Sequence, residues 1–225
     1  MPSRCEIDFA GQRFVLDAGL ALYWPAQEAL VVSDLHLEKA SFLAQFGSAV
    51  APYDTLDTLL RLEKLVAIYR PKSLILLGDS FHDRQAWARL EDAVRHQLLA
   101  ICGAMDHCHL VEGNHDLGLL GGGNLNFSAE VETAGIVFRH EPQDTDRPQI
   151  VGHFHPKLRT SLRGHRLSGK VFAVNDKLLI MPAFGTFTGG LDLNHDAFIQ
   201  LAGSSPFRAY MAYKDTVAGI ARNDL

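Results

Sequence analysis

Four short apolar runs in this chain each end in side chains that can bind a metal ion. The runs have the length and composition of buried β-strands and cover Leu30–Val32, Leu74–Leu77, Leu110–Val111 and Ile150–Val151. Aspartate, asparagine and histidine residues follow within a few positions, namely Asp34, His36, Asp79, Asn114, His115, Asp116, His153 and His155. Because the ends of several strands can converge, this pattern favours a fold in which strand ends meet around one site.

The residue types suit a pair of divalent cations. Mn²⁺, Fe²⁺ and Zn²⁺ accept mixed imidazole and carboxylate ligands, and two ions about 3.5–4 Å apart clamp the attacking and leaving oxygens of a phosphoryl displacement. Such a pair needs one bridging carboxylate. Asp79 suits this role best, because it follows a buried strand and Gly78 allows close approach of the backbone.

The remaining ligands are expected in pairs or singly from other strand ends. Asp34 and His36 lie two residues apart and project from the same side of an extended segment. His153 and His155, the second pair, have the same spacing. The amide of Asn114 and the imidazole of His140 complete the set. The sequence thus predicts seven metal ligands: Asp34, His36, Asp79, Asn114, His140, His153 and His155.

Each motif also has an ordinary structural explanation. An Asp-x-His pair is more often a turn cap, Asn114 to Asp116 alone would form a turn, and a single histidine such as His140 is more often a buried or surface residue. The ordered combination of these motifs, each after an apolar run, favours the metal site.

These motifs resemble those of the calcineurin-like metallophosphoesterases. The family series is Asp-x-His, Gly-Asp, Gly-Asn-His-Asp, a single His and Gly-His-x-His, and all five occur here in order. Four longer segments resemble the bacterial ligase-associated DNA-damage-response endonucleases (the PdeM family): 33–41, 78–83, 139–142 and 182–191.

The resemblance implies a division of the ligands between two ions. One ion takes Asp34, His36, Asp79 and His155, and the other takes Asp79, Asn114, His140 and His153. The resemblance also implies that His115 assists the departing oxygen and that Asp116 orients its imidazole. One departure is His82, which stands where many relatives have an acidic residue.

The expected fold is α/β, a four-layer αββα sandwich, because two face-to-face sheets with helices outside would bury the apolar runs and the resemblance implies the same. We expect an opening hairpin around Gly11 and helices over Thr55–Tyr69, capped by Asp54 or Thr55, and over Gln85–Ala100. A loop is expected at 121–123. Residues 1–225 are expected to form one domain, with 203–225 either draped over it or mobile.

Composition favours an ordinary cytoplasmic enzyme. No apolar run approaches the roughly 18 residues that span a bilayer, so no membrane association is expected. The N-terminus lacks an apolar secretory segment. Cys5, Cys102 and Cys108 show no zinc or redox spacing, and their odd number suits a reducing compartment.

The substrate is the least constrained feature. The net charge of −5 argues against a broad nucleic-acid-binding face. A basic segment nevertheless follows the second histidine pair, and it is either a phosphate-binding surface or a solvated hairpin turning at Gly164: Lys157, Arg159, Arg163, His165, Arg166 and Lys170.

We therefore expect a metal-dependent phosphodiesterase that uses two divalent ions, most plausibly Mn, with Fe or Zn as alternatives. DNA repair is the expected setting, and the resemblance implies an association with an ATP-dependent DNA ligase, a helicase and a nuclease. The alternatives are hydrolysis of a small cyclic nucleotide or nucleotide pyrophosphate, and a non-catalytic protein-binding module on the same fold. The presence of His115 weighs against the last.

Overall fold

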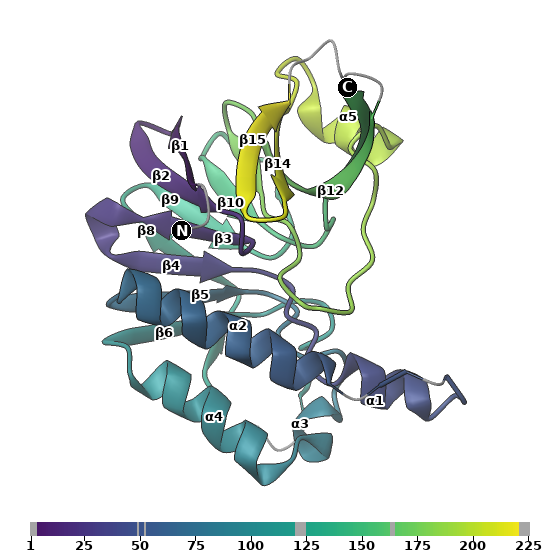
Figure 1. The fold of residues 1–225 in the computed structure, drawn as a ribbon. Helices are drawn as coiled ribbons and strands as arrows, with labels where there is room; N and C mark the ends of the chain where they lie inside the picture. The colour runs from purple at the N-terminus through teal and green to yellow at the C-terminus, as the bar shows by residue number, and fades with distance from the viewer. Residues whose placement is uncertain (1–3, 49, 52, 120–124, 163–164, 221–225) are drawn as a thin grey trace.

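The computed structural model describes residues 4–48, 50–51, 53–119, 125–162 and 165–220. Two β-sheets pack against each other, and helices lie outside them (Figure 1). The N-terminal sheet has the strand order β1 (Arg4–Phe9), β2 (Gln12–Asp17), β3 (Ala21–Trp24), β4 (Ala29–Val32), β5 (Ser73–Leu77), β6 (His107–Val111) and β7 (Phe127–Ser128). Strands β4 to β7 are parallel, whereas β1 to β4 are antiparallel.

The C-terminal sheet is also mixed. Its order is β15 (Thr216–Ile220), β14 (Arg208–Tyr213), β12 (His165–Val174), β13 (Leu178–Ile180), β10 (Gln149–Val151), β9 (Ile136–Arg139) and β8 (Glu130–Thr133), and β11 (Lys157–Leu162) pairs with β12. Strands β9, β10 and β13 are parallel. All the apolar runs that precede the predicted ligands are therefore strands.

Aromatic side chains fill the space between the sheets. Phe14 and Trp24 of the N-terminal sheet and Phe138 and Phe172 of the C-terminal sheet are fully buried in one cluster. The rings of Trp24 and Phe138 lie 6.0 Å apart across the two sheets. Burying such a side chain contributes about 1.5–3 kcal/mol, so this cluster is a principal stabilising contact between the sheets.

Helices cover the outer faces. The helix α2 (Asp54–Tyr69) packs Leu59 and Leu62 against the N-terminal sheet, and α4 (Asp92–Gly103) adds Leu98 and Ile101 (Figure 1). On the other side, α5 (Asp196–Ala202) inserts Phe198 into a cluster on the C-terminal sheet. The four-layer αββα prediction is confirmed, with α5 as the outer helix of the second side among the described residues.

Several local predictions are confirmed. The opening hairpin is β1 and β2, and α2 covers the first predicted helix. The predicted cap of α2 is wrong, because Asp54 accepts a hydrogen bond from the Ala40 amide and Thr55 from the Glu38 amide, both outside the helix. These bonds attach α2 to α1 (Lys39–Ala44), which projects from the body of the molecule (Figure 1).

The second predicted helix is broken in two. The helix α3 (Ala86–Arg89) is followed by Leu90, which has an extended backbone and a buried side chain. The helix α4 begins after Glu91. Arg95 stabilises the break, because its guanidinium donates to the carbonyl oxygens of Trp87 and Ala88 that the missing turn would have bonded.

The segment beyond Gly203 contains strands β14 and β15, which extend the C-terminal sheet. That 203–225 drapes over the domain or is mobile stays a prediction. The loop predicted at 121–123 lies outside the described residues. That the whole chain forms one domain stays a prediction. No helix in the described part of the chain is long and apolar enough to cross a membrane.

Candidate metal centre

The seven predicted ligands lie at the carboxyl ends of five strands. Asp34 and His36 follow β4, Asp79 follows β5 and Asn114 follows β6, and these strands are parallel neighbours. His140 follows β9, and the second histidine pair follows β10, again a parallel neighbour. Parallel neighbours end at the same edge of a sheet. The two edges are held together where the Phe184 amide donates to the Ser33 carbonyl at 2.7 Å.

Asp34, His36 and His155 form a first group of possible ligands. The His155 Nε2 atom lies 3.0 Å from Asp34 Oδ1 and 3.2 Å from His36 Nε2. Their ligand atoms lie within 4.8 Å of one another. The group joins residues that are 119 positions apart in the chain.

The second group surrounds His140. Its Nε2 lies 3.3 Å from Asp79 Oδ2, 3.2 Å from Asn114 Oδ1 and 3.3 Å from His153 Nδ1. The same Asp79 oxygen is 3.8 Å from His36 Nε2 in the first group. Asp79 therefore borders both groups, and so does Asp34, whose Oδ1 lies 3.9 Å from His140 Nδ1. That Asp79 is the bridging carboxylate stays a prediction.

The donor set fits divalent cations. Asp34 is completely buried and Asp79 is 2 % exposed, and a buried carboxylate requires a compensating charge. Among the described residues, the only ion-pair partners of these two carboxylates are histidines. Mixed carboxylate, imidazole and amide ligands suit Mn²⁺, Fe²⁺ and Zn²⁺. The structure thus contains a buried site of metal-centre composition, while the ligand role of each residue stays a prediction.

The pKa values of the predicted ligands also indicate a site that attracts positive charge. Burial alone would raise the pKa of Asp79, but the hydrogen bond with His140 and the surrounding imidazoles lower it to about 2. Burial opposes the charge on His140, yet the carboxylates of Asp79 and Asp34 raise its pKa to about 9. Burial lowers the pKa of His36 to about 3. Without a cation, a proton on His140 balances part of the carboxylate charge.

The backbone at the ligands is strained. Five predicted ligands adopt left-handed conformations, which side-chain-bearing residues rarely do: Asp34 (φ 55°), His36 (46°), Asp79 (47°), His153 (68°) and His155 (47°). Such strain costs about 1–3 kcal/mol per residue and clusters at functional sites. The turns are stabilised by hydrogen bonds between the strand ends, such as those from the amides of Asp34 and His36 to the carbonyls of Gly78 and Asp79.

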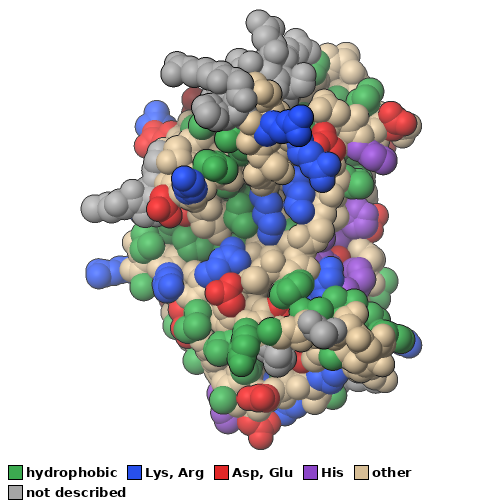
Figure 2. All heavy atoms as spheres, turned by 45° about the vertical axis from the view of Figure 1, so that its right-hand side comes forward, with side chains coloured by type: hydrophobic (Ala, Val, Ile, Leu, Met, Phe, Trp, Pro, Cys, Tyr) green, Lys and Arg blue, Asp and Glu red, His purple; other side chains and the backbone are tan. Residues whose placement is uncertain are grey.

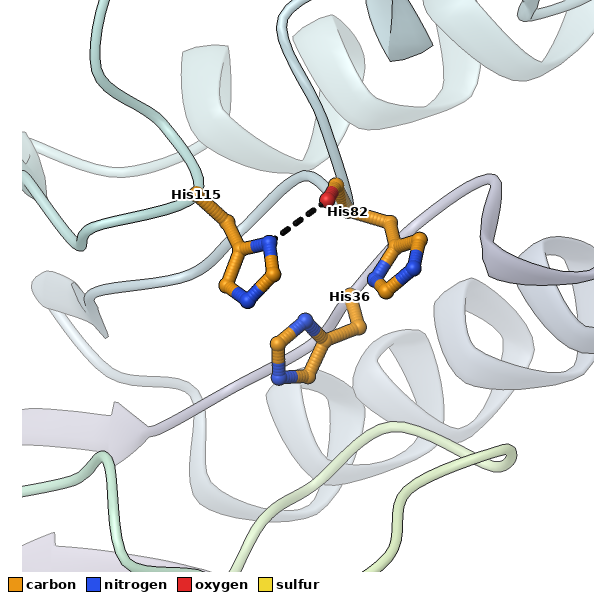
Figure 3. Close-up of side chains that lie close together, drawn as sticks. All are labelled: His36, His82 and His115. Carbon is orange, nitrogen blue, oxygen red and sulfur yellow. Dashed lines mark hydrogen bonds between the residues drawn. The ribbon is translucent and has the colours of Figure 1, made fainter. Parts of the chain in front are cut away.

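His115 lies beside this cluster. Its amide donates to Asp79 Oδ1 at 2.9 Å, and its ring Nδ1 donates to the His82 carbonyl at 2.7 Å (Figure 3). This leaves Nε2 free to face the site, 4.0 Å from Asp79 Oδ2. The imidazole is 39 % exposed, so a substrate can reach it.

Comparison with protein families now identifies the chain. Residues 29–189 match the family described as calcineurin-like phosphoesterase. The chain belongs to the calcineurin-like phosphoesterases. It is therefore a hydrolase of the metallophosphoesterase class, and the alternative of a non-catalytic module is set aside.

One solved structure, a nuclease, supports this assignment, and two others are more distantly similar. This chain is similar to the Pseudomonas putida nuclease MPE, with 30% identity and a TM-score of 0.74. The match covers 97% of this chain and 100% of that chain. The phosphoesterase Yfce from E. coli matches at 14% identity and a TM-score of 0.42, covering 86% and 98% of the two chains. A predicted phosphoesterase from Streptococcus pneumoniae matches at 12% identity and a TM-score of 0.34, covering 86% and 97%. No curated protein matches the chain.

The expected role of Asp116 in this phosphoesterase is wrong. Its carboxylate accepts hydrogen bonds from the amides of Ser80, Phe81 and Gly113 at 2.9–3.2 Å, while the His115 ring is held by the His82 carbonyl. Burial raises the pKa of Asp116 to about 7, although the three amide donors favour its ionised form. Asp116 thus fixes the loops that carry the site and does not orient His115.

The predicted basic segment forms the hairpin of β11 and β12. Lys157 pairs with Lys170, Arg159 with Ser168 and Ser161 with Arg166, so these side chains share one face of the hairpin. Arg159 and Arg166 are exposed and Lys157 is half-buried, while Arg163 lies outside the described residues. Figure 2 shows Lys and Arg side chains gathered in a stripe on one face of the molecule, beside histidine side chains.

One residue escaped the sequence analysis, and Lys170 of the basic segment has partners that the sequence did not indicate. The Ser33 hydroxyl lies 2.5 Å from Asp34 Oδ2 and 2.9 Å from the Leu77 carbonyl, so it positions a predicted ligand. Lys170 donates to the carbonyls of Ala183 and Gly185 and to Thr188, and burial lowers its pKa to about 7. The sequence places Ser33 beside Asp34, but nothing local indicates the partners of Lys170.

Proposed function

We propose that this phosphoesterase hydrolyses phosphodiester bonds within DNA strands, using two Mn²⁺ ions, with Fe²⁺ or Zn²⁺ as alternatives. The observation that carries the proposal is the position of Asp79, a buried carboxylate between two groups of imidazoles. The similarity to a nuclease over 97% of the chain supports a nucleic-acid substrate.

The chain supplies distinct groups for binding and catalysis. Asp34, His36 and His155 would hold one ion, Asn114, His140 and His153 the other, and Asp79 both. When bound, such ions stabilise the charge that develops on the phosphoryl oxygens. His115 is the proton donor to the departing oxygen, because its Nε2 faces the site while the His82 carbonyl fixes its Nδ1.

The hairpin of β11 and β12 supplies the surface for the rest of the strand. Lys157 begins β11 only two residues after the predicted ligand His155, and Arg159 and Arg166 continue the same face. Phosphate contacts of this kind fix the position of a strand without reading its sequence. A local basic face can therefore bind DNA despite the net charge of −5.

The test is an assay with manganese on four substrates: single-stranded DNA, duplex DNA, a cyclic nucleotide and an aryl phosphodiester. We expect cleavage of DNA and of the aryl phosphodiester, loss of both after chelation and recovery with Mn²⁺. Cleavage of cyclic nucleotides in place of DNA would transfer the proposal to small nucleotides. Full activity in verified metal-free protein would refute the metal mechanism.

We also propose that the enzyme works in the cytoplasm, in DNA repair, together with an ATP-dependent DNA ligase, a helicase and a nuclease. The resemblance to the ligase-associated endonucleases supports this setting. Co-purification of these partners from cells would test it.

A further inference from the structure

A hollow opens beside the predicted proton donor, His115. Its volume is about 430 Å³, and its lining includes Phe42, Arg84, Asn114, His115 and Leu117. Small-molecule sites have volumes of about 300–1,000 Å³, so the hollow is large enough for a nucleotide. It adjoins the predicted metal centre directly through Asn114 and His115.

Aromatic rings lead from the surface to this centre. Phe46 is 72% exposed, and its ring lies 5.2 Å from that of Phe42. The Phe42 ring lies 4.9 Å from that of His82, which stacks on the His115 ring at 5.2 Å with an interplanar angle of 17°. Figure 3 shows the rings of His36, His82 and His115 gathered around a common space.

Two other side chains that line the hollow are exposed and available for contacts, Leu117 and Arg84. Leu117 is 54% exposed beside the hollow. Arg84 is exposed and has no ion-pair partner among the described residues, whereas the neighbouring Asp83 is paired with Arg89. The hollow thus presents apolar and aromatic surface together with one free cation, which matches the base and the phosphate of a nucleotide.

The position of His115 determines which nucleotide would lie there. If His115 protonates the departing oxygen, the nucleotide attached to that oxygen must leave on the His115 side of the centre. We propose that the hollow is the subsite for this leaving-side nucleotide, with Phe42 stacking on its base, Phe46 extending this aromatic surface beyond the hollow, and Arg84 binding its next phosphate. This inference rests on the proposed nuclease function.

Stacking on these rings requires a base that is not engaged in a duplex. The decisive comparison is therefore between a thymidine oligomer and an oligomer of the same length in which every nucleotide lacks its base. Both oligomers carry the same phosphates, so phosphate contacts contribute equally to kcat/KM for the two oligomers. Stacking on an aromatic side chain typically changes binding by about 5- to 150-fold per base, and we expect the wild type to prefer the thymidine oligomer at least about tenfold in kcat/KM.

Three variants separate stacking from other effects. In Phe46→Ala and Phe42→Leu the preference for the thymidine oligomer should fall towards one, mainly through KM, and Phe42→Trp should restore it. Phe46 is the safer position, because its ring contacts Phe42 and not the histidines. Tyr213→Ala is the matched control, since Tyr213 is an aromatic residue of β14 that is 43% exposed, and it should keep the full preference.

The outcomes distinguish the subsite from the proposed function. Equal cleavage of the two oligomers by the wild type, or a full preference in Phe46→Ala and Phe42→Leu, would overturn the subsite while leaving the nuclease intact. The aromatic rim would then serve another purpose, such as a protein contact. Cleavage of the aryl phosphodiester with no cleavage of either oligomer would overturn the nuclease function and the subsite together.

Discussion

Gly78 lies directly against the predicted ligand His140, so its replacement by alanine tests the metal centre without removing a ligand. Gly78 has a φ of +75°, and a Cβ there would lie 2.1 Å from His140 Nδ1. An ordinary contact needs at least 3.4 Å, so the imidazole must move by more than about 1 Å. A displacement of about 1 Å at a catalytic site can lower the rate by about 100-fold. We expect kcat/KM for an aryl phosphodiester to fall by this factor, which corresponds to about 2.7 kcal/mol.

Gly135 provides the matched control for Gly78→Ala. Its φ is +78°, and a Cβ there would meet no atom within 4 Å. A left-handed alanine costs about 1–2 kcal/mol, so Gly135→Ala should lower Tm by about 2–8 °C and leave activity unchanged. Gly78→Ala should lower Tm as well, and in addition lose metal by elemental analysis. Wild-type kcat/KM in Gly78→Ala, or an equal loss of activity in Gly135→Ala, would refute the reasoning.

Four further predictions concern the predicted metal ligands, His115 and the basic face. Asp79→Asn should abolish activity and weaken both ions, because it removes their shared charge; two fully occupied ions in the purified variant would contradict the bridge. His115→Ala should keep both ions by elemental analysis and lose roughly 10²–10⁴-fold in kcat, whereas loss of metal would exclude its role as a free proton donor. Metal binding near pH 7 should release about one proton, because His140 has a pKa of about 9 in the metal-free protein and must be neutral to bind an ion. The part of this release that comes from His140 should vanish as the pH rises above about 9, and calorimetry in buffers of different ionisation enthalpy measures it; no release near pH 7 would refute the protonated His140. Arg159→Glu with Arg166→Glu should raise KM for DNA and flatten its salt dependence, while Arg13→Glu with Lys64→Glu, an equal change of charge on β2 and α2, should not; equal effects of the two pairs would point to net charge alone.

The sequence predicted the strands and the gathering of the ligands because both depend on local pattern. An apolar run followed at once by Asp34 or Asp79 indicates a buried strand and the side chain at its end, and parallel strands bring such ends together. The same reasoning located His140 and the second histidine pair, although these belong to the other sheet.

The predictions failed where a residue's partner lies far away in the sequence. The carboxylate of Asp116 accepts from the amides of Ser80 and Phe81, more than thirty positions earlier, and no local pattern indicates this. The break after α3 depends on Arg95, which reaches back to carbonyls at the end of that helix. The stacking of His82 on His115 likewise arises only when two loops meet.

The division of the ligands between the sheets determines when the nascent chain can become active. A chain emerging from the ribosome first exposes Asp34, His36, Asp79 and Asn114, all from the N-terminal sheet. His140, His153 and His155 appear only after β9 and β10 have been made, and they reach the other ligands only when the second sheet docks on the first. Under the proposed mechanism, an unfinished or truncated chain therefore lacks three of the seven predicted cation ligands and cannot cut nucleic acid. The enzyme therefore becomes active only after both sheets have folded and docked on each other.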